Sequence, residues 1–121
     1  MARIQIKDLV KTFGAYNAVS GINLEIKDGE FMIMVGPSGC GKTTTLNMIS
    51  GLETPTSGQI TIGNTVVNDL EPGERGLGMV FQDLALFPHM TVYENIAFGL
   101  RIKKVSQAEI DRRVTAAAEA V

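Results

Sequence analysis

The sequence predicts an α/β fold in which a parallel sheet with helices adjoins a small N-terminal antiparallel sheet. Residues 31–35 (FMIMV) are apolar on both faces, which is typical of a strand inside a covered parallel sheet. A glycine-rich loop and a helical segment over residues 42–50 follow at once. Residues 4–10 and 22–26 instead alternate polar and apolar side chains, as half-buried antiparallel strands do.

Local signals predict the elements between these segments. Gly14 indicates a turn between the first two strands, and Gly51 stands where the C-terminal cap of the helix belongs. Residues 59–62 and 65–67 form short alternating runs around Gly63-Asn64, which predicts a hairpin. Residues 79–81 (MVF) predict a second apolar strand.

Two helices are expected in the last third of the chain. Thr91 is followed three residues later by Glu94, which is the spacing of a capping box at a helix N-terminus. Ser106 and Glu109 repeat this spacing and predict a final helix that continues to Val121. The 121 residues fit one domain, and the sequence has no internal repeat.

Composition excludes several classes of function. The net charge of −2 gives no electrostatic reason to expect nucleic-acid binding, and the two basic pairs, 103–104 and 112–113, fit a solvated helix. The single cysteine cannot form an internal disulfide, which favours a reducing compartment. No apolar run approaches the length of a membrane span, so we expect a cytoplasmic protein that reaches a membrane only through a partner.

One motif carries a specific chemistry. Residues 36–43 (GPSGCGKT) match G-x-x-x-x-G-K-[ST], the P-loop, which chance would produce in about one chain per hundred of this composition. Glycines let backbone N–H groups turn toward phosphates, and the following helix points its positive end at them. We therefore expect ATP and Mg²⁺ as cofactors. The expected binding residues of the loop are Gly36, Pro37, Ser38, Gly39, Cys40, Gly41, Lys42, Thr43 and Thr44.

Within this loop, three side chains have individual expectations. Lys42 is expected to contact the β- and γ-phosphates as a catalytic residue, and the Thr43 hydroxyl to ligate Mg²⁺. Cys40 is either a small inert residue in a tight loop or a reactive thiol activated by Lys42 and the helix N-terminus. In either case a bulky thiol reagent should block nucleotide binding.

Gln82 ends the predicted strand over residues 79–81. It is either an ordinary polar residue at a strand end or a ligand that faces the γ-phosphate, where it contacts Mg²⁺ or orients water. Phe13, by residue type and position alone, is expected to be a core aromatic at the end of a strand. The residues alone leave the role of Gln82 open.

Taken together, the pattern resembles the ATP-binding subunits of ABC transporters. The matching stretches are Phe13-Gly14 before INLEI, then GPSGCGKTT, SGLETPTSGQITI and GMVFQDLALFPHMTVYENIAFGL. They cover most of residues 4–100, and they are most similar to importer ATPases of the maltose and oligosaccharide type. Importer ATPases for polyamines and ferric iron have similar stretches, so the transported solute stays open, with sugar as the first expectation.

The resemblance implies roles for individual residues. Phe13 stands at the aromatic that stacks on adenine, and Tyr16 is a less well-placed candidate. Gln82 stands at the glutamine that senses the γ-phosphate and Mg²⁺, which implies a catalytic and metal-binding role. His89 is expected to be a loop residue and not the histidine of the catalytic site.

The resemblance also implies two partners. The segment from Asp83 to Met90 is expected to contact a transmembrane permease subunit at the inner face of the cell membrane. Its apolar docking side chains are Leu84, Leu86, Phe87 and Pro88. A second ATP-binding subunit is expected to complete the nucleotide site as a dimer.

Four later elements of the family pattern have no match in residues 1–121: an LSGGQ signature, the Walker B strand ending in Asp-Glu, a D-loop and a switch histidine. We therefore expect residues 1–121 to be the N-terminal, incomplete part of one ATP-binding domain, truncated before the signature and Walker B elements. Without the general base, the chain should bind nucleotide but hydrolyse it negligibly by itself.

Two alternatives differ in class. A small-molecule kinase with a P-loop would need an acceptor pocket and a lid of arginines, and Arg101, Arg112 and Arg113 lie in the wrong context for a lid. A non-catalytic nucleotide-binding module is the second alternative. The favoured function is ATP hydrolysis coupled to solute import, and the substrate is chosen by other subunits.

Overall fold

The computed structural model describes residues 2–83 and 86–121, which form two units. The first unit extends to Met79 and the second from Val80 to Val121. Each unit has its own apolar core.

The first unit contains a four-stranded antiparallel sheet. Its strands are β1 (Ile4–Phe13), β2 (Tyr16–Ile26), β3 (Ser57–Ile62) and β4 (Thr65–Val66), in the order β2-β1-β3-β4. The two expected N-terminal strands and the hairpin around residues 63–64 are therefore confirmed, with β1 and β2 longer than the alternating patterns indicated.

A bulge in β1 sets which side chains enter the core. The register shifts between Ile6 and Leu9, where Asp8 has a positive φ of 48°. Asn23 holds this conformation, because its side chain accepts a hydrogen bond from the Asp8 backbone N–H and donates one to the Asp8 carboxylate, each 2.9 Å long. The bulge adds one residue to the strand. Ile6 and Leu9 are consequently both buried although they are three residues apart.

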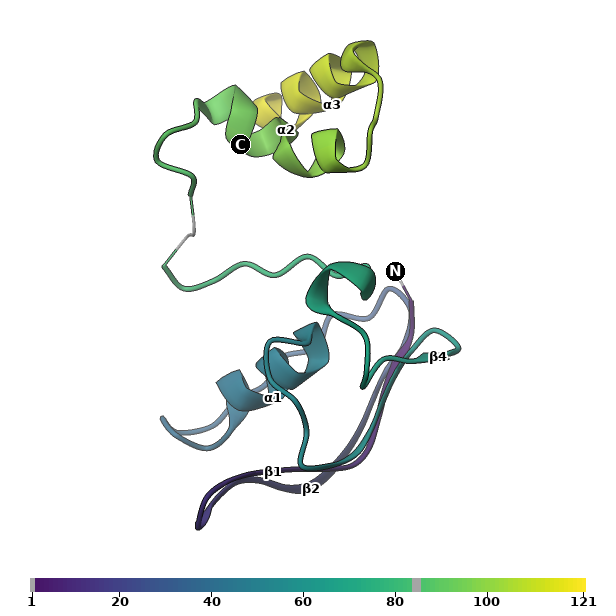
Figure 1. Cartoon of the computed structure of the whole chain (residues 1–121), viewed down its shortest axis with the longest axis vertical. Helices are drawn as coiled ribbons and strands as arrows, with labels where there is room; N and C mark the ends of the chain where they lie inside the picture. The colour runs from purple at the N-terminus through teal and green to yellow at the C-terminus, as the bar shows by residue number, and fades with distance from the viewer. Residues whose placement is uncertain (1, 84–85) are drawn as a thin grey trace. The chain divides into compact units, whose positions relative to one another are not determined.

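Helix α1 (Lys42–Ser50) covers one face of the curved sheet (Figure 1). Its bounds and its cap at Gly51, which has φ 87°, match the expectation. Met48 and Ile49 lie in the same apolar cluster as the buried side chains of the strands. This cluster fixes the position of the helix and therefore of the loop that precedes it. Its buried members are Ile6, Leu9, Val19, Met48, Ile49, Ile60 and Val67.

The buried Arg75 completes the C-terminal end of α1. It follows a short 3₁₀ helix, η1 (Pro72–Glu74), and donates to the carbonyl oxygens of Met48 (2.8 Å) and Ile49 (3.0 Å) and, through Nε, of Leu70 (2.9 Å). The last carbonyls of a helix have no partner within the helix. Arg75 supplies these partners from outside the helix.

Two expected strands are not formed. Residues 31–35 and 79–81 have no regular secondary structure, and Phe31, Val35 and Val80 are between 85% and 90% exposed. A strand that is apolar on both faces needs hydrogen-bonding neighbours and cover on both sides. Within the described residues, no strand pairs with either segment and the sheet is entirely antiparallel. The apolar pattern is present, but the surroundings it requires are not.

The second unit is a pair of helices, α2 (Val92–Ile102) and α3 (Gln107–Glu119), packed through Ala97, Ile110 and Val114. The capping box at Thr91 and Glu94 is confirmed, since both of its reciprocal hydrogen bonds are present.

The expected capping box of α3 is wrong. Ser106 is the N-cap residue but makes no side-chain cap bond, and the helix ends at Glu119 instead of Val121. The Glu109 carboxylate instead accepts hydrogen bonds of 2.6–2.8 Å from Arg112 and Arg113, which lower its pKa to about 2. Within residues 2–83 and 86–121, no helix combines the length and apolar character that a membrane span requires.

Candidate nucleotide-binding site

A pocket of about 360 Å³ lies in the first unit where the β1–β2 turn meets the start of α1. Six of the nine expected loop residues line it, together with both candidate aromatic residues and Ala18. The lining residues are Phe13, Tyr16, Ala18, Ser38, Gly39, Gly41, Lys42, Thr43 and Thr44.

The backbone at the base of the pocket is suited to anions. Gly41 is the N-cap residue of α1 with φ 89°, and no side chain caps this helix. The first N–H groups of α1 therefore have no intrahelical acceptor, and the helix dipole places partial positive charge there. A side chain at position 41 is excluded, because an added Cβ would lie 2.5 Å from the carbonyl oxygen of Ala18. Glycine is required here by strand β2 as well as by the turn.

Lys42 supplies the positive charge of the site. Its ammonium group donates to the carbonyl oxygens of Gly36 (2.5 Å) and Pro37 (2.7 Å) and lies 3.3 Å from the Cys40 sulfur. These three residues, which do not line the pocket, form the back of the loop around Lys42. The Cys40 thiol is exposed, so a thiol reagent can reach it.

Two aromatic residues, Phe13 and Tyr16, line the pocket together with the loop. Phe13 ends β1, Tyr16 begins β2, and the two residues are paired across the turn. The Tyr16 hydroxyl donates a hydrogen bond of 3.0 Å to the carbonyl oxygen of Gly39. Tyr16 therefore contacts the loop directly, although the family pattern ranks it below Phe13 as a binding residue.

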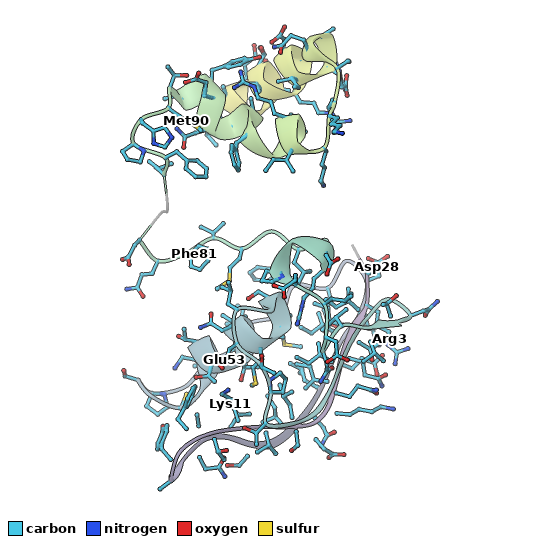
Figure 2. The ribbon with its side chains drawn as sticks, viewed as in Figure 1. Arg3, Lys11, Asp28, Glu53, Phe81 and Met90 are labelled. Carbon is cyan, nitrogen blue, oxygen red and sulfur yellow. The ribbon has the colours of Figure 1, made fainter. Side chains whose placement is uncertain are left out.

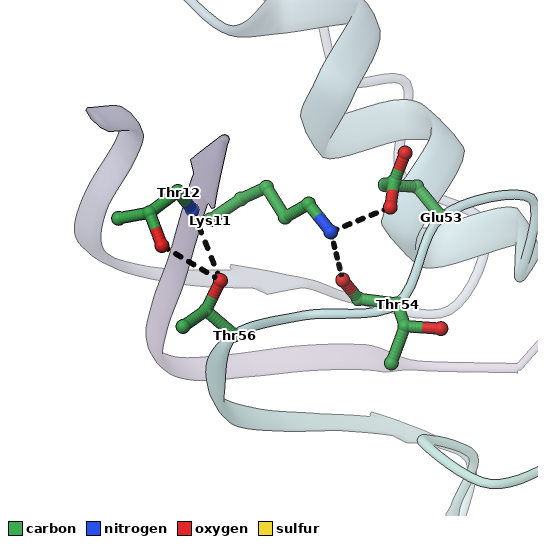
Figure 3. A network of polar contacts seen from close by, with 5 residues as sticks. All are labelled: Lys11, Thr12, Glu53, Thr54 and Thr56. Atoms are coloured by element: carbon green, nitrogen blue, oxygen red, sulfur yellow. Dashed lines mark hydrogen bonds and ion pairs between the residues drawn. The ribbon is translucent and has the colours of Figure 1, made fainter. Parts of the chain in front are cut away.

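A polar network joins Lys11 and Thr12 of β1 to Glu53, Thr54 and Thr56 (Figure 3). The Lys11 ammonium group lies 4.8 Å from the centroid of the Phe13 ring and donates to the Glu53 carboxylate at 2.5 Å and to the Thr54 carbonyl at 2.7 Å. The hydrogen bond from Lys11 is the main cause that lowers the pKa of Glu53. Lys11 precedes Phe13 by two residues, and this spacing indicates that the two side chains share a face of the strand. Nothing in the sequence indicated that Glu53 is the partner of Lys11.

Gln82 belongs to the second unit, where it is exposed, and it is not among the residues that line this pocket. In the expected docking segment, Leu86 is 73% exposed, and Phe87 packs on Phe98 with ring centroids 4.6 Å apart. His89 is exposed and touches Phe87 edge-on. Leu84 lies outside the described residues.

Asn95 holds the described part of this segment against α2. Its amide group accepts from the Phe87 N–H at 2.9 Å and donates to the carbonyl oxygens of Phe87, Met90 and Thr91 at 2.9–3.2 Å. Residues 87–91 are therefore fixed to the helix while Leu86 remains in solvent.

The donor set of the pocket fits a nucleotide. A planar base can stack on an aromatic ring, and a phosphate chain can occupy the helix N-terminus beside Lys42. Thr43 lines the same pocket at the start of α1, where its hydroxyl can reach a cation held by phosphates.

Comparisons with known proteins agree with this geometry. The family model described as "ABC transporter" matches residues 19–121. The lactose transport ATP-binding protein LacK of Rhizobium radiobacter is 53% identical over 119 residues, and the alpha-glucoside transport ATP-binding protein AglK of Rhizobium meliloti is 55% identical over 119 residues. The sn-glycerol-3-phosphate import ATP-binding protein UgpC of Bordetella avium is 56% identical over 120 residues. Each alignment covers 98% of this chain and 33% of the relative, so the chain spans about a third of their length.

Solved structures show the same fold. A dimeric ATP-binding cassette in a post-hydrolysis state, bound to ADP and Pi, matches with a TM-score of 0.80 at 36% identity, over 93% of this chain and 54% of that one. A dimeric bacterial ABC transporter cassette matches with a TM-score of 0.79 at 39% identity, over 91% and 53%. The expected α/β fold class with a P-loop and an N-terminal antiparallel sheet is thereby confirmed. The sequence, the fold and the family match together establish that this chain belongs to the ABC transporter family of ATP-binding proteins.

Proposed function

We propose that this chain binds Mg-ATP in the pocket between Phe13 and the P-loop. The observation that carries the proposal is that an uncapped helix N-terminus, Lys42 and two aromatic residues line one pocket. The first two features attract a phosphate chain and the rings offer a surface for a base. Phe13 is the proposed stacking residue for adenine.

The metal would be held by Thr43 together with the phosphates, and by Gln82. Mg²⁺ usually takes few protein ligands and several oxygen atoms from phosphates and water, and it would neutralise charge on the phosphates.

Residues 1–121 are the proposed N-terminal part of one ATP-binding domain. In the whole protein, this domain would hydrolyse ATP and couple the reaction to solute import. Transmembrane subunits would dock on residues 83–90 at the inner face of the membrane, and a second ATP-binding subunit would complete the site. The names of the relatives, which refer to lactose, alpha-glucoside and sn-glycerol-3-phosphate transport, favour a sugar or a related polyol as the solute. Polyamine or iron transport is the less favoured alternative.

The test is a calorimetric titration of the purified chain with Mg-ATP, with Lys42→Ala and Lys27→Ala as matched variants. Lys27 is an exposed lysine outside the pocket, so both changes remove the same charge. We expect Lys42→Ala to weaken binding at least about tenfold, since charge-assisted hydrogen bonds to phosphate are lost, and Lys27→Ala to leave it unchanged.

Hydrolysis by the 121-residue chain should not exceed that of Lys42→Ala. Circular dichroism of each variant verifies that the fold is retained. A folded chain that binds no Mg-ATP, or that binds equally well after Lys42→Ala, would contradict the proposed function.

A further inference from the structure

We infer that Lys11 is a positioning residue for the base-binding ring, because its ammonium group is held by Glu53 directly over the face of Phe13. The inference rests on the proposed function, in which Phe13 stacks on adenine. It assigns a role in nucleotide affinity to a lysine that does not line the pocket.

The contact follows from the strand geometry. Residues 11 and 13 are two apart on β1, so their side chains share one face of the strand. The Lys11 nitrogen lies 4.8 Å from the Phe13 ring centroid, within the range of a cation–π interaction. Phe13 is 46% exposed as a residue, whereas Lys11 is half-buried and its side chain is only 13% exposed. The position of the Lys11 side chain is therefore more restricted than that of Phe13.

Two hydrogen bonds keep the Lys11 side chain in place. Its ammonium group donates to Glu53 at 2.5 Å and to the Thr54 carbonyl at 2.7 Å, and the labelled side chains of Lys11 and Glu53 lie close together (Figure 2). The adjoining backbone is fixed as well, because Thr12 N–H donates to the Thr56 hydroxyl at 3.0 Å (Figure 3). The α1–β3 connection therefore serves as a fixed support for the ammonium group.

Two consequences for base stacking follow. A cation over one face restricts the motion of the ring, so less freedom is lost when a base binds. The ammonium group also attracts the π electrons of Phe13 toward its own side, and the depleted opposite face favours contact with an electron-rich purine. Both effects act on the base and not on the phosphates.

A purely structural role makes a different prediction. If Lys11 only tied β1 to the α1–β3 connection, its loss would disturb the unit as a whole and weaken the binding of any ligand. The two roles are separated by comparing ATP with inorganic tripolyphosphate, which has phosphates but no base, and by removing the Phe13 ring independently.

The experiment measures ATP and tripolyphosphate affinities by calorimetry at 0.15 M salt for the unaltered chain, Lys11→Met, Lys11→Arg, Phe13→Leu and the double variant Lys11→Met/Phe13→Leu. We expect Lys11→Met to weaken ATP binding about two- to fivefold and Lys11→Arg to restore it, since arginine also stacks on aromatic faces. Tripolyphosphate affinity should change by less than about 1.5-fold, because salt screens a lysine outside the pocket. In the Phe13→Leu background, Lys11→Met should have no effect on ATP binding.

The inference would be overturned if Lys11→Met weakened the binding of ATP and of tripolyphosphate equally. It would also be overturned if Lys11→Met weakened ATP binding as much in the Phe13→Leu background as in the unaltered chain. Either result would leave the proposed function intact. Absence of ATP binding by the folded, unaltered chain would overturn the proposed function and this inference with it. If circular dichroism shows that Lys11→Met does not fold, the ATP affinities of Lys11→Arg and Lys11→Gln are compared instead. The inference then predicts weaker ATP binding for the neutral glutamine variant alone.

Discussion

The Tyr16 hydroxyl donates a hydrogen bond of 3.0 Å to the carbonyl oxygen of Gly39, which joins the first residue of β2 to the tip of the P-loop. The two residues are 23 positions apart in the chain. Gly39 has a φ of 79°, a backbone conformation that residues with a side chain rarely adopt. The hydrogen bond from Tyr16 helps to stabilise this conformation. Tyr16 thus lines the pocket beside Phe13 and also contacts the P-loop.

Tyr16→Phe is expected to weaken the binding of ATP and of tripolyphosphate by a similar factor, about two- to tenfold. The ring stays, but the loop loses one hydrogen bond, which is worth roughly 0.5–1.5 kcal/mol. Calorimetric titration of both ligands measures the effect. The matched control is Tyr93→Phe, which removes the hydroxyl that bonds Asp111 and Gln107 in the second unit. Unchanged tripolyphosphate affinity in Tyr16→Phe would show that the hydroxyl does not shape the loop.

Arg75→Met is expected to destabilise the first unit by about 2–4 kcal/mol, because it leaves buried carbonyls without donors. Burial lowers the pKa of Arg75. Its guanidinium group nevertheless donates hydrogen bonds to the carbonyl oxygens of Met48, Ile49 and Leu70. Urea denaturation followed by circular dichroism measures the change. Arg3→Met is the matched control, since Arg3 forms an exposed ion pair with Glu25 that should contribute less than about 1 kcal/mol. Equal effects of the two substitutions would argue against the capping role of Arg75.

The Lys11–Glu53 pair should make stability depend on pH in a defined direction. The folded pKa of Glu53 lies below its ordinary value of 4.5, chiefly because of the hydrogen bond from Lys11. A lowered pKa means that the carboxylate stabilises the folded state fully above the unfolded pKa. This contribution is lost as the pH falls through the folded pKa.

The difference in melting temperature between the unaltered chain and Glu53→Gln should therefore be constant above about pH 6 and shrink below about pH 4.5. Glu94, Glu109 and Asp111 also have lowered pKa values, so the whole chain loses stability in acid. These groups are the same in both proteins, and the comparison isolates Glu53. A difference that grows in acid would exclude the ion pair as its source.

Local signals predicted the elements whose causes are local. Helix α1 and its cap at Gly51 were predicted because the P-loop opens a helix and glycine accepts the positive φ that ends it. The N-terminus of α2 was predicted for a similar reason, since Thr91 and Glu94 form their reciprocal bonds within one turn.

The errors arose where a local pattern depends on distant partners. Residues 31–35 have the composition of a buried strand, but a strand requires neighbours that the described residues do not provide. Ser106 and Glu109 have the spacing of a capping box, but Arg112 and Arg113 compete successfully for the carboxylate. In both cases residues outside the local pattern decide the structure.

The sequence by itself determined the family, the P-loop and the first turn of α1, because residues 36–43 are contiguous and their backbone geometry is set by glycine. Only the tertiary structure decided which residues support the pocket. Tyr16 reaches Gly39 across 23 positions and Lys11 reaches Glu53 across 42. Those pairings depend on the register of β1 and β2, on the bulge at Asp8 and on the packing of α1 against the sheet. Contacts between distant residues are fixed by packing, and no periodicity along the chain encodes them.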